Sequence, residues 1–293
     1  MSVSLIIPTY NRDALLRTTL QSVVEQNLSD LTLEVIVADD GSSDRTKEVI
    51  AEYKERLELN YLFQENRGFR VASARNMAIK EAKNELCVFI DAGMVIAPDF
   101  VKSHYQAHQG SPEAITTIGY MYGTEPDDLY FREQLKAQFF DLVKGTAKET
   151  FELFRTSGQF YDAREQDYQS CQDELNGLPA PWVLYWTCNV AARRELLLEL
   201  GGFDTNYDGC WGMEDVDLGY HMYSKGVGFK LVRGAEGLHI PHKKNPKERE
   251  VQEMRNKQYF YEKFPAYETE LLLHCGTHEL NDKLVTNTST VPI

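Results

Sequence analysis

The sequence predicts an α/β fold in which helices flank a mostly parallel central sheet. Short β-branched runs alternate with helical patterns over about the first hundred residues, and strands separated by such helices pair in parallel through right-handed crossovers. The chain has 293 residues, of which 42% are hydrophobic and 26% are charged. This composition is typical of a globular protein, and it excludes the collagen-like, disordered and coiled-coil classes.

Four strands are expected in this first part, each a short apolar run that a polar or turn residue ends. They cover residues 3–8, 31–38, 59–63 and 86–90. A helical pattern with Leu16 and Leu20 on its apolar face follows the first strand, and a second helix is expected after Ser43 as its cap. A third helix is expected at about residues 71–82. This order indicates a Rossmann-like, doubly wound arrangement.

A polar cluster follows each of the four predicted strands. The clusters are Thr9-Tyr10-Asn11-Arg12, Asp39-Asp40-Gly41-Ser42, Arg67-Gly68-Phe69-Arg70 and Asp91. Each cluster alone is also compatible with a simple turn or a helix cap. Ligands of such sheets, however, bind outside the carboxyl ends of the strands, so four clusters at one edge favour a binding site.

The residue types at this edge suit a nucleotide. No G-x-G-x-x-G follows the first strand and no G-x-x-x-x-G-K-[ST] occurs, which argues against dinucleotide dehydrogenases and P-loop nucleotide hydrolases. Asp39 is able to accept a hydrogen bond from a base N–H, and Arg67, Arg70 and Arg75 are able to meet a diphosphate. Arg70 and Arg75 also have an alternative interpretation as surface charges on a helix.

The middle of the chain is rich in aromatic and acidic residues and carries no chemical motif. Residues 110–181 include helical stretches at 129–144 and 147–155, and we expect them to form an insertion that shapes an acceptor site. A strand is expected at 186–192, followed by a helix at 193–200 with Gly201-Gly202 as its C-cap.

Acidic residues and histidines stand out in the second half. Glu214, Asp215 and Asp217 open a helix, where the macrodipole favours carboxylates, so capping alone can account for them. A pair of carboxylates beside a tryptophan can also accept a hydroxyl proton and bind a sugar hydroxyl. His239 and His242 stand in His-Ile-Pro-His, a spacing that lets both imidazoles reach one divalent cation.

Charge and hydropathy exclude other classes of protein. The formal net charge of −14 argues against non-specific nucleic-acid binding, which requires a basic face. No apolar run approaches the roughly 20 residues that span a bilayer, and the N-terminus lacks the basic region of a signal peptide. We therefore expect no transmembrane segment and a cytoplasmic location. The five cysteines are scattered and are expected to be reduced thiols.

The ordered set of these motifs resembles the family 2 glycosyltransferases of GT-A fold. The segments that carry the resemblance are Ile7-Pro8-Thr9-Tyr10-Asn11-Arg12, Ala38 to Asp44, Asn66-Arg67-Gly68, Ala74-Arg75-Asn76, Phe89-Ile90-Asp91 and Gly202 to Leu218. The match runs from about residue 3 to about residue 243. Residues 203–218 and the His-Ile-Pro-His stretch also resemble β-1,4-galactosyltransferases and chondroitin-polymerase-type enzymes.

The resemblance implies one GT-A domain at residues 1–245. Its parts would be a nucleotide-binding half at 1–109, the helical insertion at 110–181 and an acceptor and catalytic half at 182–245, and a C-terminal helix and tail would follow at 246–293. The implied reaction is an inverting transfer of a hexose or N-acetylhexosamine from a UDP-sugar to a hydroxyl of a carbohydrate or glycoconjugate acceptor, as in polysaccharide biosynthesis. A lipid-linked acceptor would bring the protein to a membrane surface.

The resemblance also implies roles for individual residues. The nucleotide sugar would be surrounded by Pro8, Thr9, Tyr10, Arg12, Asp39, Gly41, Arg67, Arg70, Arg75 and Asp91. Asp215 would act as the general base, and Glu214 would orient the acceptor. Trp211 and Gly212 would border the acceptor, with Trp211 stacked on a sugar face.

One departure from the family pattern concerns the metal. The family usually has Asp-x-Asp after the fourth strand, whereas this chain has Asp91-Ala92-Gly93. Three alternatives follow: Asp91 with His242, and with His239, holds Mn²⁺ or Mg²⁺; protein cations replace the metal; or the chain is a catalytically impaired sugar-nucleotide-binding protein or scaffold of a polysaccharide assembly complex. A sugar-phosphate nucleotidyltransferase is a rival enzyme class, but the loop after the first strand lacks the glycines of that class.

Overall fold

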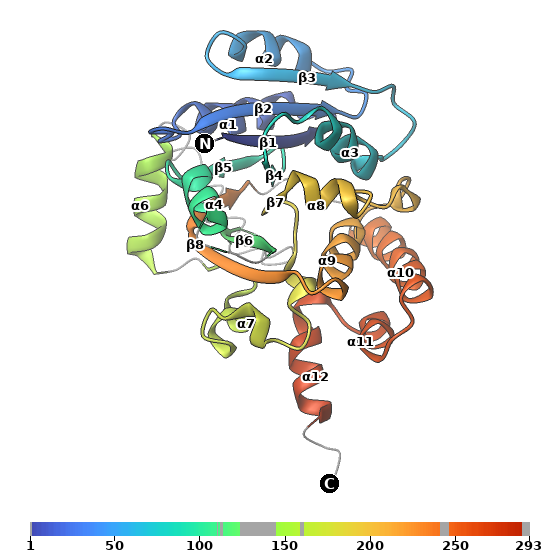
Figure 1. Cartoon of the computed structure of the whole chain (residues 1–293). Coiled ribbons are helices and arrows are strands. Elements are labelled where there is room, and N and C mark those ends of the chain that lie inside the picture. Colours follow the sequence, from blue (N-terminus) through green and yellow to red (C-terminus); the bar gives the residue numbers. More distant parts are fainter. Residues whose placement is uncertain are drawn as a thin grey trace.

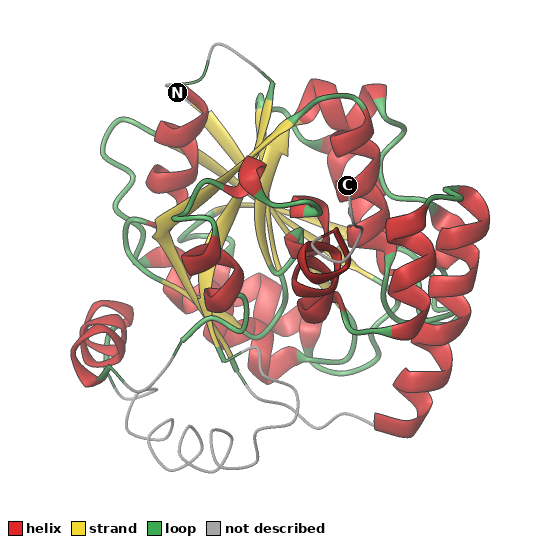
Figure 2. Cartoon of the chain, turned by 90° about the horizontal axis from the view of Figure 1, so that it is seen from below, coloured by secondary structure: helices red, strands yellow, loops and turns green. Residues whose placement is uncertain are grey.

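The computed structural model describes residues 2–109, 111, 114–123, 145–158, 161–240 and 246–288. Within them, helices flank an eight-stranded sheet with the strand order β3-β2-β1-β4-β7-β6-β8-β5 (Figure 1). Figure 2 shows the twist of the strands and the helices on both sides of them. The predicted α/β class with a central sheet is confirmed.

The first half of the sheet has the predicted parallel order. Its strands are β1 (Ser2–Thr9), β2 (Thr32–Asp39), β3 (Glu58–Phe63) and β4 (Leu86–Ile90), and every pair among them is parallel. The helices between them are α1 (Asp13–Val24), α2 (Thr46–Tyr53) and α3 (Val71–Glu81). Strand β1 is buried on both faces, as expected for a parallel strand that helices cover.

The start of α2 differs from the prediction. Asp44, not Ser43, bonds the first residue of the helix, because the Asp44 carboxylate accepts from the Thr46 N–H at 3.0 Å and from the Thr46 hydroxyl at 2.6 Å. The Ser43 N–H instead donates to Asn11 Oδ1 at 2.8 Å. This bond ties the loop after β2 to the loop after β1, at the edge where the polar clusters meet.

The second half of the sheet is mixed. Strand β7 (Asn189–Arg193) is antiparallel to β4, β6 (Ile115–Tyr122) is antiparallel to β7, and β8 (Gly228–His239) is parallel to β6. The short β5 (Met94–Ile96) pairs antiparallel with β8. The strand expected at 186–192 therefore begins only at Asn189.

Strands β6 and β8 are interior strands of the sheet, and the sequence did not indicate them. Residues 110–181 are accordingly not only helical, since β6 lies among them and seven of its eight residues are buried. The helix expected at 147–155 is present as α6 (Ala147–Ser157), whereas the one expected at 129–144 lies outside the described residues. The other helices here are α4 (Phe100–Gln109) and α7 (Glu165–Ser170).

The remaining helices build the second half around the sheet. Helix α8 (Arg194–Glu199) ends as predicted, because Gly201 and Gly202 have φ of +83° and +75° and the Gly202 N–H donates to Leu197 O at 2.8 Å. They are followed by α9 (Glu214–Ser224), α10 (Pro246–Lys263), α11 (Tyr267–Leu271) and α12 (Leu280–Thr288). Short 3₁₀ turns are η1 (Leu175–Gly177), η2 (Pro181–Leu184), η3 (Thr205–Tyr207), η4 (Leu272–His274) and η5 (Thr277–Glu279).

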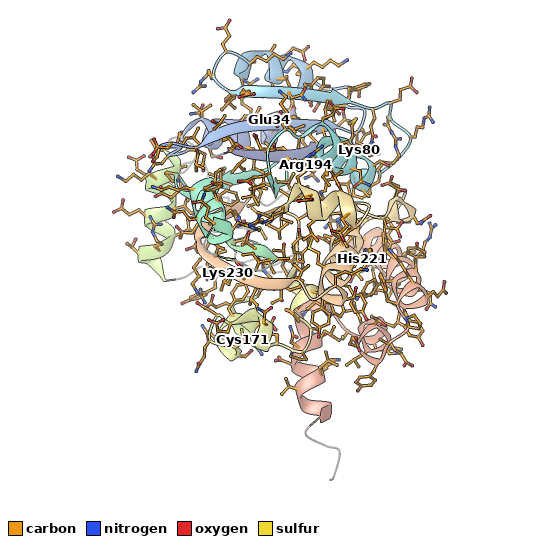
Figure 3. All side chains as sticks on the ribbon, viewed as in Figure 1. Glu34, Lys80, Cys171, Arg194, His221 and Lys230 are labelled. Atoms are coloured by element: carbon orange, nitrogen blue, oxygen red, sulfur yellow. The ribbon has the colours of Figure 1, made fainter. Side chains whose placement is uncertain are left out.

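Two apolar clusters, one on each face of the sheet, hold these elements together. Alternate residues of β1 divide between them, with Leu5 and Ile7 in one cluster and Ile6 in the other. Away from the polar edge, Arg194 joins the halves by donating to Ile79 O at 2.9 Å and Lys80 O at 2.8 Å (Figure 3). Among the described helices, none has both the length and the apolar character that crossing a bilayer requires.

Candidate active site

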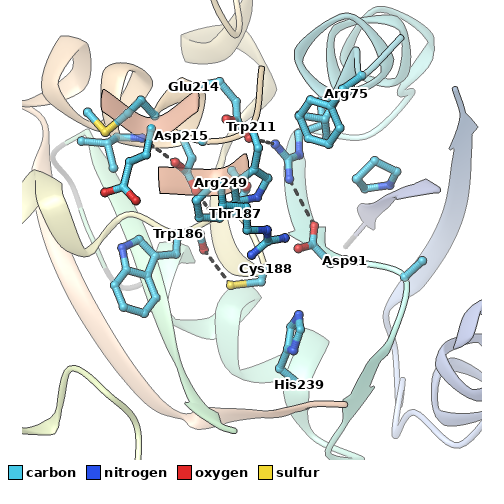
Figure 4. A pocket seen from close by; sticks show the side chains of 18 of the residues that line it. Arg75, Asp91, Trp186, Thr187, Cys188, Trp211, Glu214, Asp215, His239 and Arg249 are labelled. Carbon is cyan, nitrogen blue, oxygen red and sulfur yellow. Dashed lines mark hydrogen bonds and ion pairs between the residues drawn. The ribbon is translucent and has the colours of Figure 1, made fainter. Parts of the chain in front are cut away.

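A cavity of about 710 Å³ opens at the carboxyl ends of β1, β2 and β4. Most of the predicted site residues line it, and they come from both halves of the chain (Figure 4). The predicted residues in its wall are Pro8, Thr9, Tyr10, Arg12, Arg75, Asp91, Trp211, Gly212, Glu214, Asp215 and His239. His242 lies outside the described residues.

Four predicted residues are not in the cavity wall. Asp39 is fully buried and accepts from the Tyr61 hydroxyl at 2.6 Å, while Arg67 has a side chain that is 72% exposed and pairs with Glu65. Arg70 lies 3.4 Å from the Asp40 carboxylate. Gly41 has φ +90°, and an added Cβ would lie 2.3 Å from the backbone nitrogen of Asn66, so only glycine fits at this turn.

Arg75 joins the two halves at the centre of the site. This residue is 3% exposed, and its guanidinium donates to Glu214 Oε1 at 2.7 Å and to Asp91 Oδ1 at 3.1 Å (Figure 4). Burial alone would raise the pKa of Asp91, but the charges of Arg75, His239 and Arg12 lower it below its usual value. Asp91 is therefore ionised at neutral pH, and Arg75 offsets two carboxylates that desolvation would otherwise penalise.

Asp215 stands in the first turn of α9 beside Glu214. Its carboxylate accepts from the Val216 N–H at 2.8 Å and from the Thr187 N–H at 3.2 Å. Burial, followed by the charge of Glu214, raises the pKa of Asp215 to about 7, although Arg75 and the two N–H groups act in the opposite direction. A carboxylate with such a pKa is matched to general-base chemistry near neutral pH.

Three polar atoms of the cavity residues are buried and have no hydrogen-bond partner among the described residues. They are Glu214 Oε2, the hydroxyl oxygen of Thr9 and Arg75 Nε. An unpaired buried polar atom costs free energy, and such atoms cluster at binding sites, where a ligand satisfies them. The three atoms come from β1, α3 and α9, so both halves of the chain contribute to them.

The loop before α9 has an unusual backbone that helix α10 supports. Gly212 and Met213 have φ of +91° and +77°, a conformation that is costly for methionine. Asn256 of α10 donates to Gly212 O at 2.7 Å and to Trp211 O at 3.2 Å, and Gln252 accepts from the Trp211 N–H at 2.9 Å. The C-terminal segment thus fixes the loop that presents Glu214 and Asp215.

The aromatic side chain of Trp211 is already in contact with a cation. The Arg249 guanidinium lies 4.0 Å from the centroid of its ring. Sugar stacking on Trp211 is therefore restricted to the part of the ring that Arg249 leaves uncovered. Arg249 also lines the cavity, and the sequence analysis did not identify it because no motif surrounds it.

The third acid of the motif has a structural role. Asp217 is 2% exposed and accepts from the Tyr207 hydroxyl at 2.9 Å and from Lys263 Nζ at 2.9 Å. Lys263 also donates to Asp204 Oδ2 at 2.7 Å. These bonds fasten α10 to α9 and η3, so Asp204 and Asp217 support the site without lining it.

The described residues supply only some of the ligands that a divalent cation requires. No group of three His, Cys, Asp or Glu side chains within them is arranged to hold a metal. Asp91 and His239 lie on the same side of the cavity (Figure 4). Asp91 is ionised and has one carboxylate oxygen that Arg75 does not engage, so the donor chemistry fits a hard cation once further oxygen or nitrogen ligands join.

The chain matches two family models that divide it near its middle. Residues 4–169 match "Glycosyl transferase family 2", and residues 170–243 match "N-terminal domain of galactosyltransferase". The chain is 35% identical over 272 residues to "Validoxylamine A glucosyltransferase" of Streptomyces hygroscopicus subsp. limoneus, covering 92% of this chain and 58% of that protein. It is 28% identical to "Chondroitin synthase" of Pasteurella multocida (strain Pm70), over 93% of this chain and 28% of that protein.

Solved structures support the same fold. Residues 1–349 of S. aureus TarS match with a TM-score of 0.61 and 15% identity, covering 100% of this chain and 76% of that chain. The mannosyltransferase PcManGT from Pyrobaculum calidifontis, in complex with GDP-Man and Mn²⁺, matches with a TM-score of 0.60 and 19% identity, over 99% and 76%. The predicted GT-A fold is confirmed. The chain spans about 60% of the length of the two Streptomyces relatives that it matches at 35% identity.

Proposed function

Because the chain belongs to glycosyl transferase family 2, we propose that it transfers a hexose or N-acetylhexosamine from a UDP-sugar to a hydroxyl group of a carbohydrate or glycoconjugate, with inversion at the anomeric carbon. The observation that carries the proposal is Asp215, a carboxylate of raised pKa in a cavity that nucleotide-side residues also line. Arg75 holds this arrangement together through Asp91 and Glu214.

Asp215 acts as the general base in this proposal. It accepts the proton of the acceptor hydroxyl while that oxygen attacks the anomeric carbon from the face opposite the leaving diphosphate. The new C–O bond forms as the bond to the diphosphate breaks, and the nucleoside diphosphate leaves with the bonding electron pair. A single displacement inverts the anomeric configuration, and Glu214 Oε2 is available to orient a sugar hydroxyl.

The donor binds, in this proposal, at the strand ends of the first half. Thr9, Tyr10, Arg12 and Phe69 line that side of the cavity, and Tyr10 and Phe69 are 43% and 41% exposed. Exposed aromatic rings suit the face of a nucleobase, and Arg12 suits a phosphate. TarS has been solved with UDP-GlcNAc, whereas PcManGT has been solved with GDP-Man. We propose uridine as the nucleoside of the donor.

We also propose that Asp91 and His239, with His242, hold Mn²⁺ or Mg²⁺. PcManGT has been solved with Mn²⁺, and Asp91 is ionised, as a ligand of a hard cation must be. When bound, the cation would neutralise charge on the leaving diphosphate. The protein's own part is to keep Asp91 charged and oriented through Arg75.

The test is a transfer assay on the purified protein. Nucleotide sugars and a panel of sugar acceptors are screened with and without Mn²⁺ or Mg²⁺, and the anomeric configuration of the product is read by NMR. Asp215→Asn should lower kcat by about 10²- to 10⁴-fold, because it removes the general base, while calorimetric binding of UDP persists. Asp282→Asn, an exposed site on α12, serves as the matched control.

Two outcomes would reject the proposal. One is an Asp215→Asn variant that transfers at the wild-type rate. The other is a wild-type protein that binds UDP-sugars but neither hydrolyses nor transfers them, which would favour a sugar-nucleotide-binding protein or scaffold.

A further inference from the structure

The C-terminal segment forms one wall of the cavity. Glu253 of α10 lines the cavity together with Thr277 and His278 of η5. These residues come from a part of the chain that lies beyond both family matches, which end at residues 169 and 243. The donor-side residues described above come from the first half of the chain instead, so the two walls are contributed by separate segments.

A buried lysine fixes this wall. Lys257 is 5% exposed, and its ammonium group donates to the Cys275 carbonyl at 2.7 Å and lies 2.8 Å from Glu253 Oε1. A buried ammonium is retained only when it is paired and hydrogen-bonded. Lys257 therefore connects Glu253 to the segment that leads into η5, which indicates a built site and not a chance surface.

The C-terminal wall is built beside the two tryptophans of the cavity. Turn η5 packs against η2 (Pro181–Leu184), which directly precedes Trp186, and α10 bonds the backbone of Trp211 through Gln252 and Asn256. Asp91 and His239 belong to the donor end in the proposed function (Figure 4). Because in-line attack places the acceptor and the leaving group on opposite sides of the anomeric carbon, we expect the acceptor hydroxyl to reach Asp215 along the wall that α10 and η5 form.

We propose that Glu253, Thr277 and His278, with the rings of Trp186 and Trp211, form a subsite for an uncharged, polyhydroxylated acceptor ring. The inference deepens the proposed function and rests on it. Carboxylate, hydroxyl and imidazole groups bind ring hydroxyls, and tryptophan rings cover the apolar C–H face of a sugar.

The charges at this end select against anionic acceptors. A carboxylate or phosphate on the acceptor would approach Asp215 and Glu253 and be repelled by both. Hydroxyl groups, in contrast, donate to these carboxylates. The cations nearby have other contacts. Lys257 pairs with Glu253, Arg249 lies over the Trp211 ring, and the buried Arg164 lies over the Trp186 ring and pairs with Asp162.

The experiment compares acceptor and donor kinetics in the full chain. Glu253→Gln and Thr277→Val should each raise the acceptor KM by about fivefold to tenfold, the equivalent of one hydrogen bond. The donor KM and the rate of donor hydrolysis without acceptor should stay unchanged. Glu262→Gln, an exposed glutamate on the same helix, is the matched control. The probes are methyl glycosides of neutral hexoses and the same rings oxidised to uronates.

Neutral glycosides should have a higher acceptor kcat/KM than the uronates. The Glu253→Gln variant should show a smaller ratio between these two kcat/KM values. Unchanged acceptor KM in both variants, preference for the uronates, or failure of every neutral glycoside would overturn the subsite. Donor hydrolysis separates this failure from failure of the proposed function, because hydrolysis requires the donor end and Asp215 but not the acceptor wall. Thr277→Val leaves the Lys257 contacts intact, so it tests the subsite without disturbing the wall.

Discussion

The ionisation of Asp215 depends on its immediate neighbours. Burial and Glu214 raise its pKa to about 7, while Arg75 and the N–H groups of Thr187 and Val216 stabilise the carboxylate. Arg75 carries out this function because Asp91 and Glu214 hold its guanidinium in place. One residue pair, Glu214 and Arg75, thereby shifts the pKa of Asp215 in opposite directions.

This environment predicts a pH dependence. Below about pH 7 Asp215 is protonated and cannot accept the acceptor proton, so kcat/KM should fall about tenfold for each further pH unit. The measurement is kcat/KM from pH 5 to 9 at constant ionic strength. A rate that stays flat down to pH 5 would show that Asp215 does not titrate as the base. Asp282→Asn should keep the wild-type profile.

Local sequence pattern predicted which residues lie at the site better than it predicted the contacts between them. It identified Asp91, Glu214 and Asp215, which follow a strand or open a helix and are therefore marked by local pattern. It left two interpretations of Arg75 open, as a diphosphate ligand or as a surface charge, because its partner Glu214 lies 139 positions away in the chain. It also favoured Asp39, whereas the neighbouring Asp40 lines the cavity.

Helix α10 controls the loop that leads into α9. Gly212 and Met213 both have positive φ, and Asn256 satisfies the carbonyls of Trp211 and Gly212. A left-handed methionine costs on the order of 1–3 kcal/mol and persists only when its surroundings enforce it. The direction in which Glu214 and Asp215 point therefore depends on a helix that starts more than thirty residues later in the chain.

Asn256→Ala should lower kcat by roughly tenfold or more, because a displacement of about 1 Å in the catalytic group is costly. The affinity for UDP should stay unchanged, since Asn256 lies behind the loop and not in the cavity wall. Steady-state kinetics and calorimetry measure the two quantities. Gln258→Ala, an exposed amide two residues further along α10, is the control. A loss of thermal stability with unchanged kcat would contradict a positioning role.

Whole elements were predictable only where their pattern was local. Strands β1 to β4 are short, apolar runs bounded by turn residues, and their order followed from the helices between them. Strand β8 contains Gly228, Gly234 and Gly237 with several charged residues, a composition typical of a loop. Its pairing with β6 includes a register shift at Gly119, so tertiary contacts and not local propensity form it.

At the scale of the whole molecule, the C-terminal segment is an integral part of the fold. Lys263 connects α10 to Asp204 and to Asp217 of α9. Asn76 of α3 in turn donates to Phe203 O at 2.7 Å and accepts from the Phe203 N–H at 2.8 Å. A chain of polar contacts therefore runs from α3, in the first half of the chain, to α10 in its last third.

Lys263→Met should destabilise the protein by about 1–3 kcal/mol, because the carboxylates of Asp204 and Asp217 lose their cation. This value takes into account that the lysine is partly exposed to solvent. The expected result is a Tm that is several degrees lower with a single unfolding transition, measured by calorimetry. Lys225→Met, at an exposed position after α9, should leave the Tm unchanged. Equal Tm values for both variants would show that the Lys263 contacts carry no stability.

The pairing of β5 with β8 has a consequence for biosynthesis. Met94 pairs with His239, and a ribosome that adds about 5–20 residues per second takes on the order of ten seconds to travel from one to the other. During that interval β5, whose Met94 and Ile96 are fully buried in the finished protein, has no strand partner. The nascent chain thus exposes an apolar edge that can pair with other chains until β8 is synthesised.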